Sequence, residues 1–389
     1  MMPDSVDVLL QQMVRIDSVN SASSGNMQAE AELGAYLEEV ARGWGIAVQR
    51  LPVEGRPDNL LLTVEASGAA DRASWLLFDS HMDTVSVENM TIDPFGGVIE
   101  NGRLFGRGAC DTKGTGAAML WALKEYRAQH ERPNNVALLF TVDEEVTLSG
   151  ARSFAQNDLP RLGITFSGMI VGEPTLLRPV IAHNGVVRWT ITTTGLAAHA
   201  AAPDLGRNAI DMMVKVLAAV QSRYIAKLEG EHPMTGRNVC SATTIRGGTQ
   251  VNIVPDRCQV TIDHRFIPGR RADDCLRQVQ AVLEELMAAD PSVRVEQSGA
   301  YGAPALDPVV SERYLPVVQR VLERHGLTDP PIGAPFATNA GDFAEVGLPA
   351  IVLGPGDPTP AHTRNEWVEL AQIHRGVAVY GDLMRERPV

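Results

Sequence analysis
The chain contains 389 residues, more than one ordinary hydrophobic core needs, so two domains are expected. Its 44% hydrophobic and 21% charged residues are typical of a globular protein, and its formal net charge of -13 argues against nucleic acid or an anionic membrane surface as partner. No run approaches the roughly 20 apolar residues of a membrane span. Residues 1–7 lack the basic region of a secretion signal, so a cytoplasmic location is expected.

The first part of the chain alternates between helical and strand patterns. Apolar residues recur with helical period at 6–14 and 28–44, whereas 59–64 and 75–80 are apolar runs typical of strands. A helix expected over 116–130 then leads to another strand over 135–142. This alternation predicts an α/β domain with a mostly parallel sheet covered by helices on both faces.

A different pattern begins near residue 180. We expect strands at 186–195, 240–246, 257–266 and 293–297, with helices at 208–223 and 273–288. This order, β-α-β-β-α-β, is the ferredoxin-like split motif. A helix over 311–325 and a strand over 350–354 then return to the first pattern. The sequence thus predicts a catalytic domain formed by 1–179 and 299–389, with an inserted domain at 180–298.

The four cysteines, at positions 110, 240, 258 and 275, show no CxxC spacing. They lie in segments that resemble strands, helices or turns. We therefore expect reduced, buried thiols.

Polar residues follow the buried strand that contains Trp75–Phe78. His81 and Asp83 come just past its carboxyl end, where ligands bind in open α/β sheets. Residues two apart in an extended chain point to the same side, so the Asp83 carboxylate can contact the His81 imidazole and orient it as a metal ligand. Asp111 follows a glycine-rich turn and precedes an alanine-rich helix, which suits a ligand held on irregular backbone.

Acidic residues recur at later strand ends. Glu144 and Glu145 follow the strand at 135–142, Glu173 follows a short apolar strand at 168–171, and His362 follows the strand at 350–354. Together with His81 and Asp111, the three residues Glu145, Glu173 and His362 provide two imidazoles and three carboxylates, which suit two metal ions such as zinc with one carboxylate shared. Two such ions activate water and polarise a carbonyl group. Glu144 remains free beside the ligands, the natural place for a general base.

Six motifs stand in the order found in one known family. They are Ser80–Val85, Gly106–Gly114, Asp143–Glu145, Gly172–Thr175, Ala198–Pro203, and Leu353–Gly356 leading to Ala361–His362. Through them nearly the whole chain resembles the dinuclear zinc aminoacylases and carboxypeptidases, the M20-type family. That family includes acetylornithine deacetylase, succinyl-diaminopimelate desuccinylase, aminoacylase-1 and the glutamate-releasing carboxypeptidase.

The resemblance assigns roles to the residues at the strand ends. It implies that one metal is held by His81, Asp111 and Glu173, and the other by Asp111, Glu145 and His362. Asp83 would support His81, and Glu144 would act first as base and then as acid. Glutamate at 173 occurs in the deacylase branch, where some peptidase branches carry aspartate, and this favours an acyl amino acid substrate.

The inserted domain would contribute to substrate binding and to a homodimer. His199 matches a family histidine that reaches across a dimer to the substrate carbonyl oxygen. Asn252 and Arg265 match substrate-binding positions. A guanidinium group suits a carboxylate because it donates two parallel hydrogen bonds.

Together with the strand-end residues, the resemblance implies a metal-dependent amidohydrolase that cleaves the amide bond of an N-acyl-L-amino acid, as acetylornithine deacetylase does. Zinc is the expected metal, and cobalt and manganese fit the same ligands. The alternatives within the family are a dipeptidase or carboxypeptidase and a desuccinylase. An alternative of another class is a catalytically silent metal-binding scaffold, against which the free Glu144 argues.

Overall fold
The computed structural model describes residues 2–67 and 74–387, which form two compact units. The first unit comprises Met1–Ile181, Asp307–Ile332 and Thr338–Val389, and the second comprises Ala182–Leu306 and Gly333–Ala337.

An eight-stranded sheet, with the strands in the order β1-β2-β6-β3-β7-β18-β8-β17, lies in the first unit except for residues 182–183 of β8 and 333–334 of β17, which belong to the second. Its strands are β1 (Ala47–Leu51), β2 (Asn59–Val64), β3 (Trp75–His81), β6 (Asn135–Thr141), β7 (Phe166–Val171), β8 (Val180–His183), β17 (Ile332–Ala334) and β18 (Ala350–Val352). The central strands β6, β3, β7 and β18 are parallel, whereas β1, β2 and β8 pair antiparallel. The predicted mostly parallel central sheet is confirmed.

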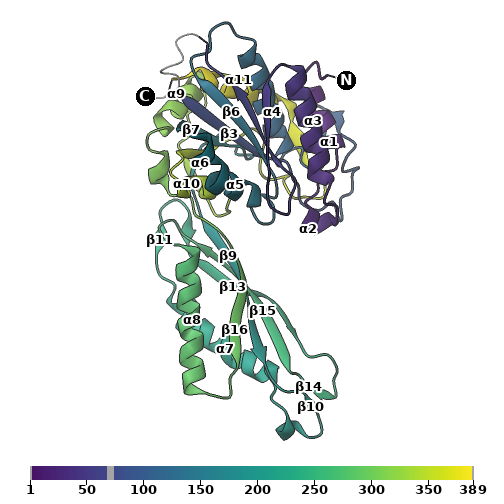
Figure 1. Ribbon diagram of the computed structural model, residues 1–389, viewed down its shortest axis with the longest axis vertical. Coiled ribbons are helices and arrows are strands. Elements are labelled where there is room, and N and C mark those ends of the chain that lie inside the picture. The colour runs from purple at the N-terminus through teal and green to yellow at the C-terminus, as the bar shows by residue number, and fades with distance from the viewer. Residues whose placement is uncertain (1, 68–73, 388–389) are drawn as a thin grey trace. The chain divides into compact units, whose positions relative to one another are not determined.

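Helices lie on both faces of this sheet, as Figure 1 shows. They are α1 (Val6–Arg15), α2 (Ser21–Ser24), α3 (Ala29–Gly43), α4 (Lys113–Arg127), α5 (Ser149–Ser153), α6 (Leu159–Leu162), α9 (Leu315–Arg324), α10 (Ala340–Glu345) and α11 (Leu370–Arg385). Helix α4 packs on β3 and β6 and contacts α1 and α11, whereas α3 packs on β1 and β2. All seven residues of β6 are buried, as expected of a strand covered on both faces.

A small three-stranded sheet joins two distant parts of the first unit. It contains β4 (Val98–Glu100), β5 (Arg103–Phe105) and β19 (Trp367–Glu369), with β5 in the middle. Trp367 pairs with Phe105, and Glu369 pairs with Arg103. This pairing brings the segment after His362 beside the glycine-rich turn that ends at Asp111.

The second unit contains a four-stranded antiparallel sheet in the order β13-β15-β9-β16. Its main elements are β9 (Gly185–Thr194), α7 (Ala209–Arg223), β13 (Val239–Gly247), β15 (Arg257–Phe266), α8 (Ala272–Ala289) and β16 (Val295–Ala303). The predicted ferredoxin-like order is therefore confirmed. Two short antiparallel pairs of strands add β10 (Ala198–His199) with β14 (Ile253–Val254), and β11 (Glu231–His232) with β12 (Gly236–Arg237).

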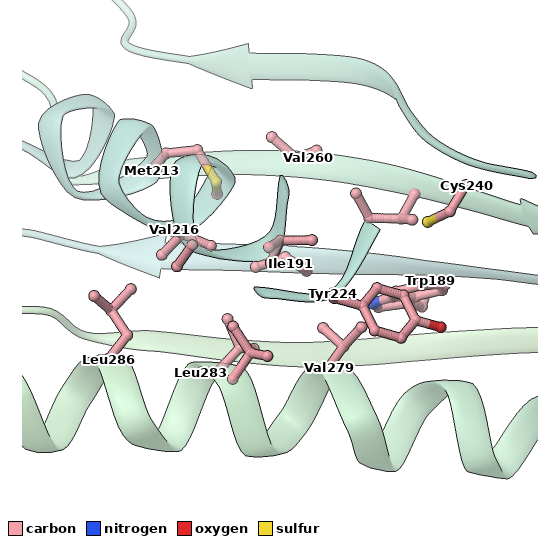
Figure 2. Close-up of a cluster of buried hydrophobic side chains, with 14 of the residues drawn as sticks. Trp189, Ile191, Met213, Val216, Tyr224, Cys240, Val260, Val279, Leu283 and Leu286 are labelled. Atoms are coloured by element: carbon pink, nitrogen blue, oxygen red, sulfur yellow. The ribbon is translucent and has the colours of Figure 1, made fainter. Parts of the chain in front are cut away.

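The core of the second unit lies between the sheet and its two long helices. Figure 2 shows Val279, Leu283 and Leu286 of α8 directed toward the same layer as Ile191 of β9 and Val216 of α7. Positions 279, 283 and 286 follow the spacing of four and three that places apolar residues on one helix face. Such spacing is typical of a helix, in agreement with the helix expected at 273–288.

The second unit extends beyond the expected boundary at residue 298. Strand β16 changes register between Ser298 and Tyr301 and then pairs with β9 again, as far as Ala303 opposite Val186. Residues 333–337 also belong to this unit. Asn184 N–H donates to Ala334 O, so backbone pairing holds this short return segment.

Two further sequence expectations concern cysteines and membrane spans. All four cysteines are free and buried, as predicted. Within residues 2–67 and 74–387, none of the helices combines the length and apolar character needed to span a bilayer.

Candidate active site
The predicted site residues of the first unit gather where its parallel strands end. His81 is the last residue of β3 and lies opposite Thr141, the last residue of β6. Glu144 and Glu145 follow β6, and Glu173 follows β7. Because these strands run in parallel, their carboxyl ends share one edge of the sheet.

Asp111 lies at the centre of this group. Its Oδ1 is 3.2 Å from His81 Nε2, and its Oδ2 is 3.1 Å from His362 Nε2. The Asp111–Thr112 peptide bond is cis, and α4 begins at the next residue, Lys113. One carboxylate thus faces both imidazoles, with one oxygen directed to each.

The other three carboxylates surround the two histidines. Glu145 Oε1 lies 3.1 Å from His362 Nε2, and Glu173 Oε1 lies 4.0 Å from His81 Nε2. Among the described residues, two sets have ligand atoms within 4.8 Å of one another: His81, Asp111 and Glu145, and His81, Glu144 and Glu173. The structure therefore brings together all five predicted metal ligands and Glu144.

The backbone and side chain of Asp83 both face the imidazole of His81. Nδ1 of His81 lies 2.9 Å from the backbone oxygen of Asp83 and 3.4 Å from its carboxylate Oδ1. Since a carbonyl oxygen only accepts, the 2.9 Å contact assigns the proton to Nδ1. Nε2 is then free to direct its lone pair toward Asp111 and the site. The sequence predicted the carboxylate contact, but the shorter contact is to the backbone.

The electrostatics of the site follow from burial and from crowding of like charges. Burial is the main cause that raises the pKa of Glu144 and Glu173, and neighbouring carboxylates raise both further. Hydrogen bonds to Asp111 and Glu145 raise the pKa of His362 to about 11. Burial opposes protonation of His81, but its contacts with Asp111 and Asp83 outweigh this and raise its pKa.

These donors fit divalent metal ions. The site combines two imidazoles with carboxylates that repel one another when ionised, and cations placed among them would relieve that repulsion. Imidazole and carboxylate are both ordinary zinc ligands. The donor set does not distinguish zinc from cobalt or manganese, which take the same ligand types.

Comparison with known proteins identifies the family. A family model described as peptidase family M20/M25/M40 matches residues 77–386. The chain belongs to this family. It is therefore a metal-dependent hydrolase that acts on amide or peptide bonds.

Relatives of this M20 protein include two acetylornithine deacetylases. The one from Myxococcus xanthus is 32% identical over 330 residues, covering 82% of this chain and 81% of the relative. The one from Proteus mirabilis is 27% identical over 385 residues, covering 97% and 95%. A solved M20 family metallo-carboxypeptidase from Sulfolobus solfataricus has a TM-score of 0.77 at 17% identity and covers 99% of this chain and 100% of that chain. The last similarity establishes a shared fold.

The remaining predicted site residues lie in the second unit of the M20 chain. His199 and Asn252 are exposed and belong to neighbouring segments, because Ala200 N–H donates to Asn252 O. Ala201 N–H donates to His199 Nδ1 at 3.0 Å. Nδ1 is therefore the acceptor nitrogen, and Nε2 carries the proton of the neutral ring.

Arg265 has a partner within its own strand. Its Nε lies 2.8 Å from Asp263 Oδ1, and its Nη2 lies 3.3 Å from Asp263 Oδ2. Arg188 also donates to Asp263 Oδ2, at 2.7 Å. Two guanidinium groups therefore share one carboxylate, and Asp263 holds the Arg265 fork in a fixed orientation.

Sequence reasoning missed several residues that support the M20 site. Glu366 is buried and accepts the backbone N–H groups of Cys110 and Asp111, each at 3.0 Å. Arg107, also buried, pairs with Glu366. Arg107 lies within the glycine-rich motif Gly106–Gly114, and a charged residue in such a turn was the available signal. Glu366 lies four residues after His362, where the sequence offers no comparable signal.

Proposed function
We propose that this M20 protein hydrolyses the amide bond of an N-acyl-L-amino acid, as acetylornithine deacetylases do. The observation that carries the proposal is the position of Asp111 between His81 and His362, with Glu144 close by. Two relatives that carry the name acetylornithine deacetylase align with most of the chain and support this substrate class.

Two metal ions, zinc in our proposal, would each take three protein ligands. His81, Asp111 and Glu173 would hold one ion, and Asp111, Glu145 and His362 would hold the other. When bound, the pair would supply a water that ionises near neutral pH and would polarise the substrate carbonyl group.

Glu144 would move the proton. Its carboxylate would accept a proton from the attacking water and deliver it to the amide nitrogen as the C–N bond breaks. The products are then a carboxylate and a free amino acid. Burial and adjacent carboxylates raise the pKa of Glu144, and a carboxyl group with a raised pKa is better suited to donate the proton in the second step.

Residues of the second unit would bind the substrate and stabilise its charge. His199 would donate from Nε2 to the carbonyl oxygen, a role supported by the acceptor contact at its Nδ1. Arg265 would bind the α-carboxylate, and Asn252 would add a polar contact near His199.

We further propose that the protein is a homodimer built through the second unit. Strand β13 forms an edge of the four-stranded sheet, where only β15 pairs with it among the described strands. Most of its residues are exposed, including Val239 at 57% and Ile245 at 60%. An exposed edge strand with apolar side chains favours pairing with the same strand of a second copy.

A substrate panel tests the proposed function. Zinc-loaded protein would be assayed with N-acetyl amino acids, N-succinyl amino acids and dipeptides, and kcat/KM compared. We expect the highest value for an N-acetyl substrate. Preference for dipeptides or succinyl compounds would select the peptidase or desuccinylase instead. Stoichiometric metal without hydrolysis of any of the three would indicate a scaffold protein.

A further inference from the structure
Three consecutive residues shortly after β6 each donate a backbone N–H group to a buried carboxyl group. Asp143 N–H donates to Glu30 Oε1 at 2.8 Å. Glu144 N–H donates to Asp83 Oδ1 at 2.9 Å, and Glu145 N–H donates to Asp83 Oδ2 at 3.0 Å. The position of both glutamates therefore depends on where these carboxyl groups are held.

Asp143 has a backbone conformation that needs support. Its φ is 60°, in the left-handed region that non-glycine residues seldom adopt. Its side chain accepts hydrogen bonds from Thr147 and Ser149, and Arg56 Nε lies 3.2 Å from its Oδ2. These contacts keep the chain in the turn that directs Glu144 and Glu145 toward the histidines.

One residue connects the two carboxylates that control this turn. Asn20 Nδ2 donates to Asp83 Oδ2 at 2.8 Å and to Asp143 Oδ1 at 2.9 Å. An amide nitrogen has two N–H groups, so both donors of Asn20 are in use. Asn20 thus bridges Asp83, which contacts His81, and Asp143, which begins the turn that contains Glu144.

The orientation of Asn20 is fixed on its remaining sides. Its Oδ1 accepts the N–H of Ala22 at 3.0 Å, and its own N–H donates to Thr84 O at 2.9 Å. The side chain has no exposed surface. Because Oδ1 faces an N–H donor, the amide cannot flip without losing three hydrogen bonds.

The charges around Asn20 explain why an amide stands there. Asp83, Asp143 and Glu30 are three buried carboxyl groups, and Arg56 is the cation that pairs with Asp143. A neutral amide with two donors lets two carboxylates approach one point without adding charge. A fourth carboxyl group at this position would repel both.

We propose that Asn20 is a positioning residue, which holds Glu144 and Glu145 in place through Asp83 and Asp143. The proposal rests on the metal and base roles proposed above for the two glutamates. Asn20 lies outside residues 77–386, the part of the chain that the family model matches. The residues that hold the candidate site in place therefore include one in the segment between α1 and α2.

Two substitutions separate positioning from packing. Asn20→Asp keeps the shape of the side chain but replaces both donors by an acceptor, whereas Asn20→Ala removes the side chain. If Asn20 positions carboxylates, Asn20→Asp is the more harmful change. If Asn20 only fills space, both substitutions lower the free energy of unfolding but leave the zinc affinity of the folded protein unchanged. The exposed Asn26, whose Oδ1 accepts Gln28 N–H, gives the matched control Asn26→Asp.

The first measurement is zinc affinity by competition with a chromogenic chelator, which does not depend on catalysis. We expect Asn20→Asp to weaken zinc binding by about 10-fold to 100-fold, as loss of a residue that orients metal ligands commonly does. Asn20→Ala should fall between it and wild type, and Asn26→Asp should match wild type. Wild-type affinity in folded Asn20→Asp protein would overturn the proposal.

The second measurement is turnover at saturating zinc. We expect kcat of Asn20→Asp to fall about 10-fold to 100-fold while KM changes little, because the base is displaced and substrate contacts remain. Wild-type kcat in folded Asn20→Asp protein would count against positioning, as would failure of both Asn20 variants to fold. If wild-type protein hydrolyses no amide substrate, the proposed function fails, and the zinc competition still decides the role of Asn20.

Discussion
Arg107 Nη1 lies 2.6 Å from Glu366 Oε2, and both side chains are buried in the first unit. The other oxygen of Glu366 accepts the N–H of Asp111, the carboxylate that faces both histidines. The ion pair therefore holds the backbone of the central metal-ligand candidate.

Removing one partner of this pair should be costly. Arg107→Ala leaves the buried carboxyl group of Glu366 without its cation, so we expect the free energy of unfolding to fall by about 3–5 kcal/mol. Arg42, which is 57% exposed and pairs with Glu38 at 2.9 Å, gives the control, and Arg42→Ala should cost less than about 1 kcal/mol. Urea denaturation of metal-free protein, followed by circular dichroism, measures both. Equal losses would show that burial does not govern the strength of the Arg107 pair.

Substitution of the two adjacent glutamates should separate base from ligand. Glu144→Gln should lower kcat by about 10²–10⁴ and leave two zinc ions bound per chain, because it removes the proton acceptor. Glu145→Gln should lower the zinc content, because it removes a carboxylate 3.1 Å from His362. Metal analysis after dialysis and steady-state kinetics give both quantities. Loss of zinc from Glu144→Gln would mean that the two roles are exchanged.

Zinc binding should release protons. In metal-free protein His362, with its pKa raised to about 11, is cationic at pH 7, and burial keeps Glu173 protonated to higher pH than usual. Metal ligands bind without their protons, so zinc affinity should rise with pH and fall as pH drops below these raised pKa values. Calorimetry of zinc binding at pH 7 in two buffers of different ionisation enthalpy measures the release. Identical heats in both buffers would contradict it.

Arg265 should distinguish substrates by their carboxylate. Arg265→Ala should raise KM strongly for N-acyl amino acids and little for the corresponding amides, because only the acids accept the paired hydrogen bonds. Arg188→Ala is a suitable control, since Arg188 contacts the same Asp263 from a neighbouring strand. Steady-state kinetics on acid and amide pairs provide the test. Equal losses on both substrates would give Arg265 a structural role.

His199 should act across the proposed dimer. His199→Ala should lower kcat by about 10²–10³, because it removes a donor to the charge that develops on the carbonyl oxygen. Mixing His199→Ala with Glu144→Ala protein, then dissociating and reassociating the dimers, should restore about a quarter of wild-type activity. Half of the dimers are then mixed, and each mixed dimer has one complete site of two.

A second mixture controls this experiment. Asp111 and Glu144 both belong to the first unit, so a mixture of Asp111→Ala and Glu144→Ala chains should form no complete site. Activity should stay at the level of the separate variants. If the His199→Ala mixture also recovered nothing, His199 would act within its own chain.

The sequence by itself determined the parallel sheet and the residues at its edge. Leu76–Ser80 and Asn135–Thr141 are continuous runs of apolar or uncharged residues, apart from Asp79, and all of these residues are buried, as expected of strands covered on both faces. Residues that directly follow such strands must lie together when the strands are parallel. His81, Glu145 and Glu173 could therefore be grouped from local patterns, without knowledge of any contact.

Only the tertiary structure decided how these residues are held. Asn20 meets Asp83 and Asp143 across 63 and 123 positions, and Arg107 meets Glu366 across 259. Such contacts leave no periodic trace in a sequence, because each depends on a single polar group that finds its partner after the core has packed. Buried donors and acceptors must be paired once water is excluded, and it is the folded chain that selects which residues pair.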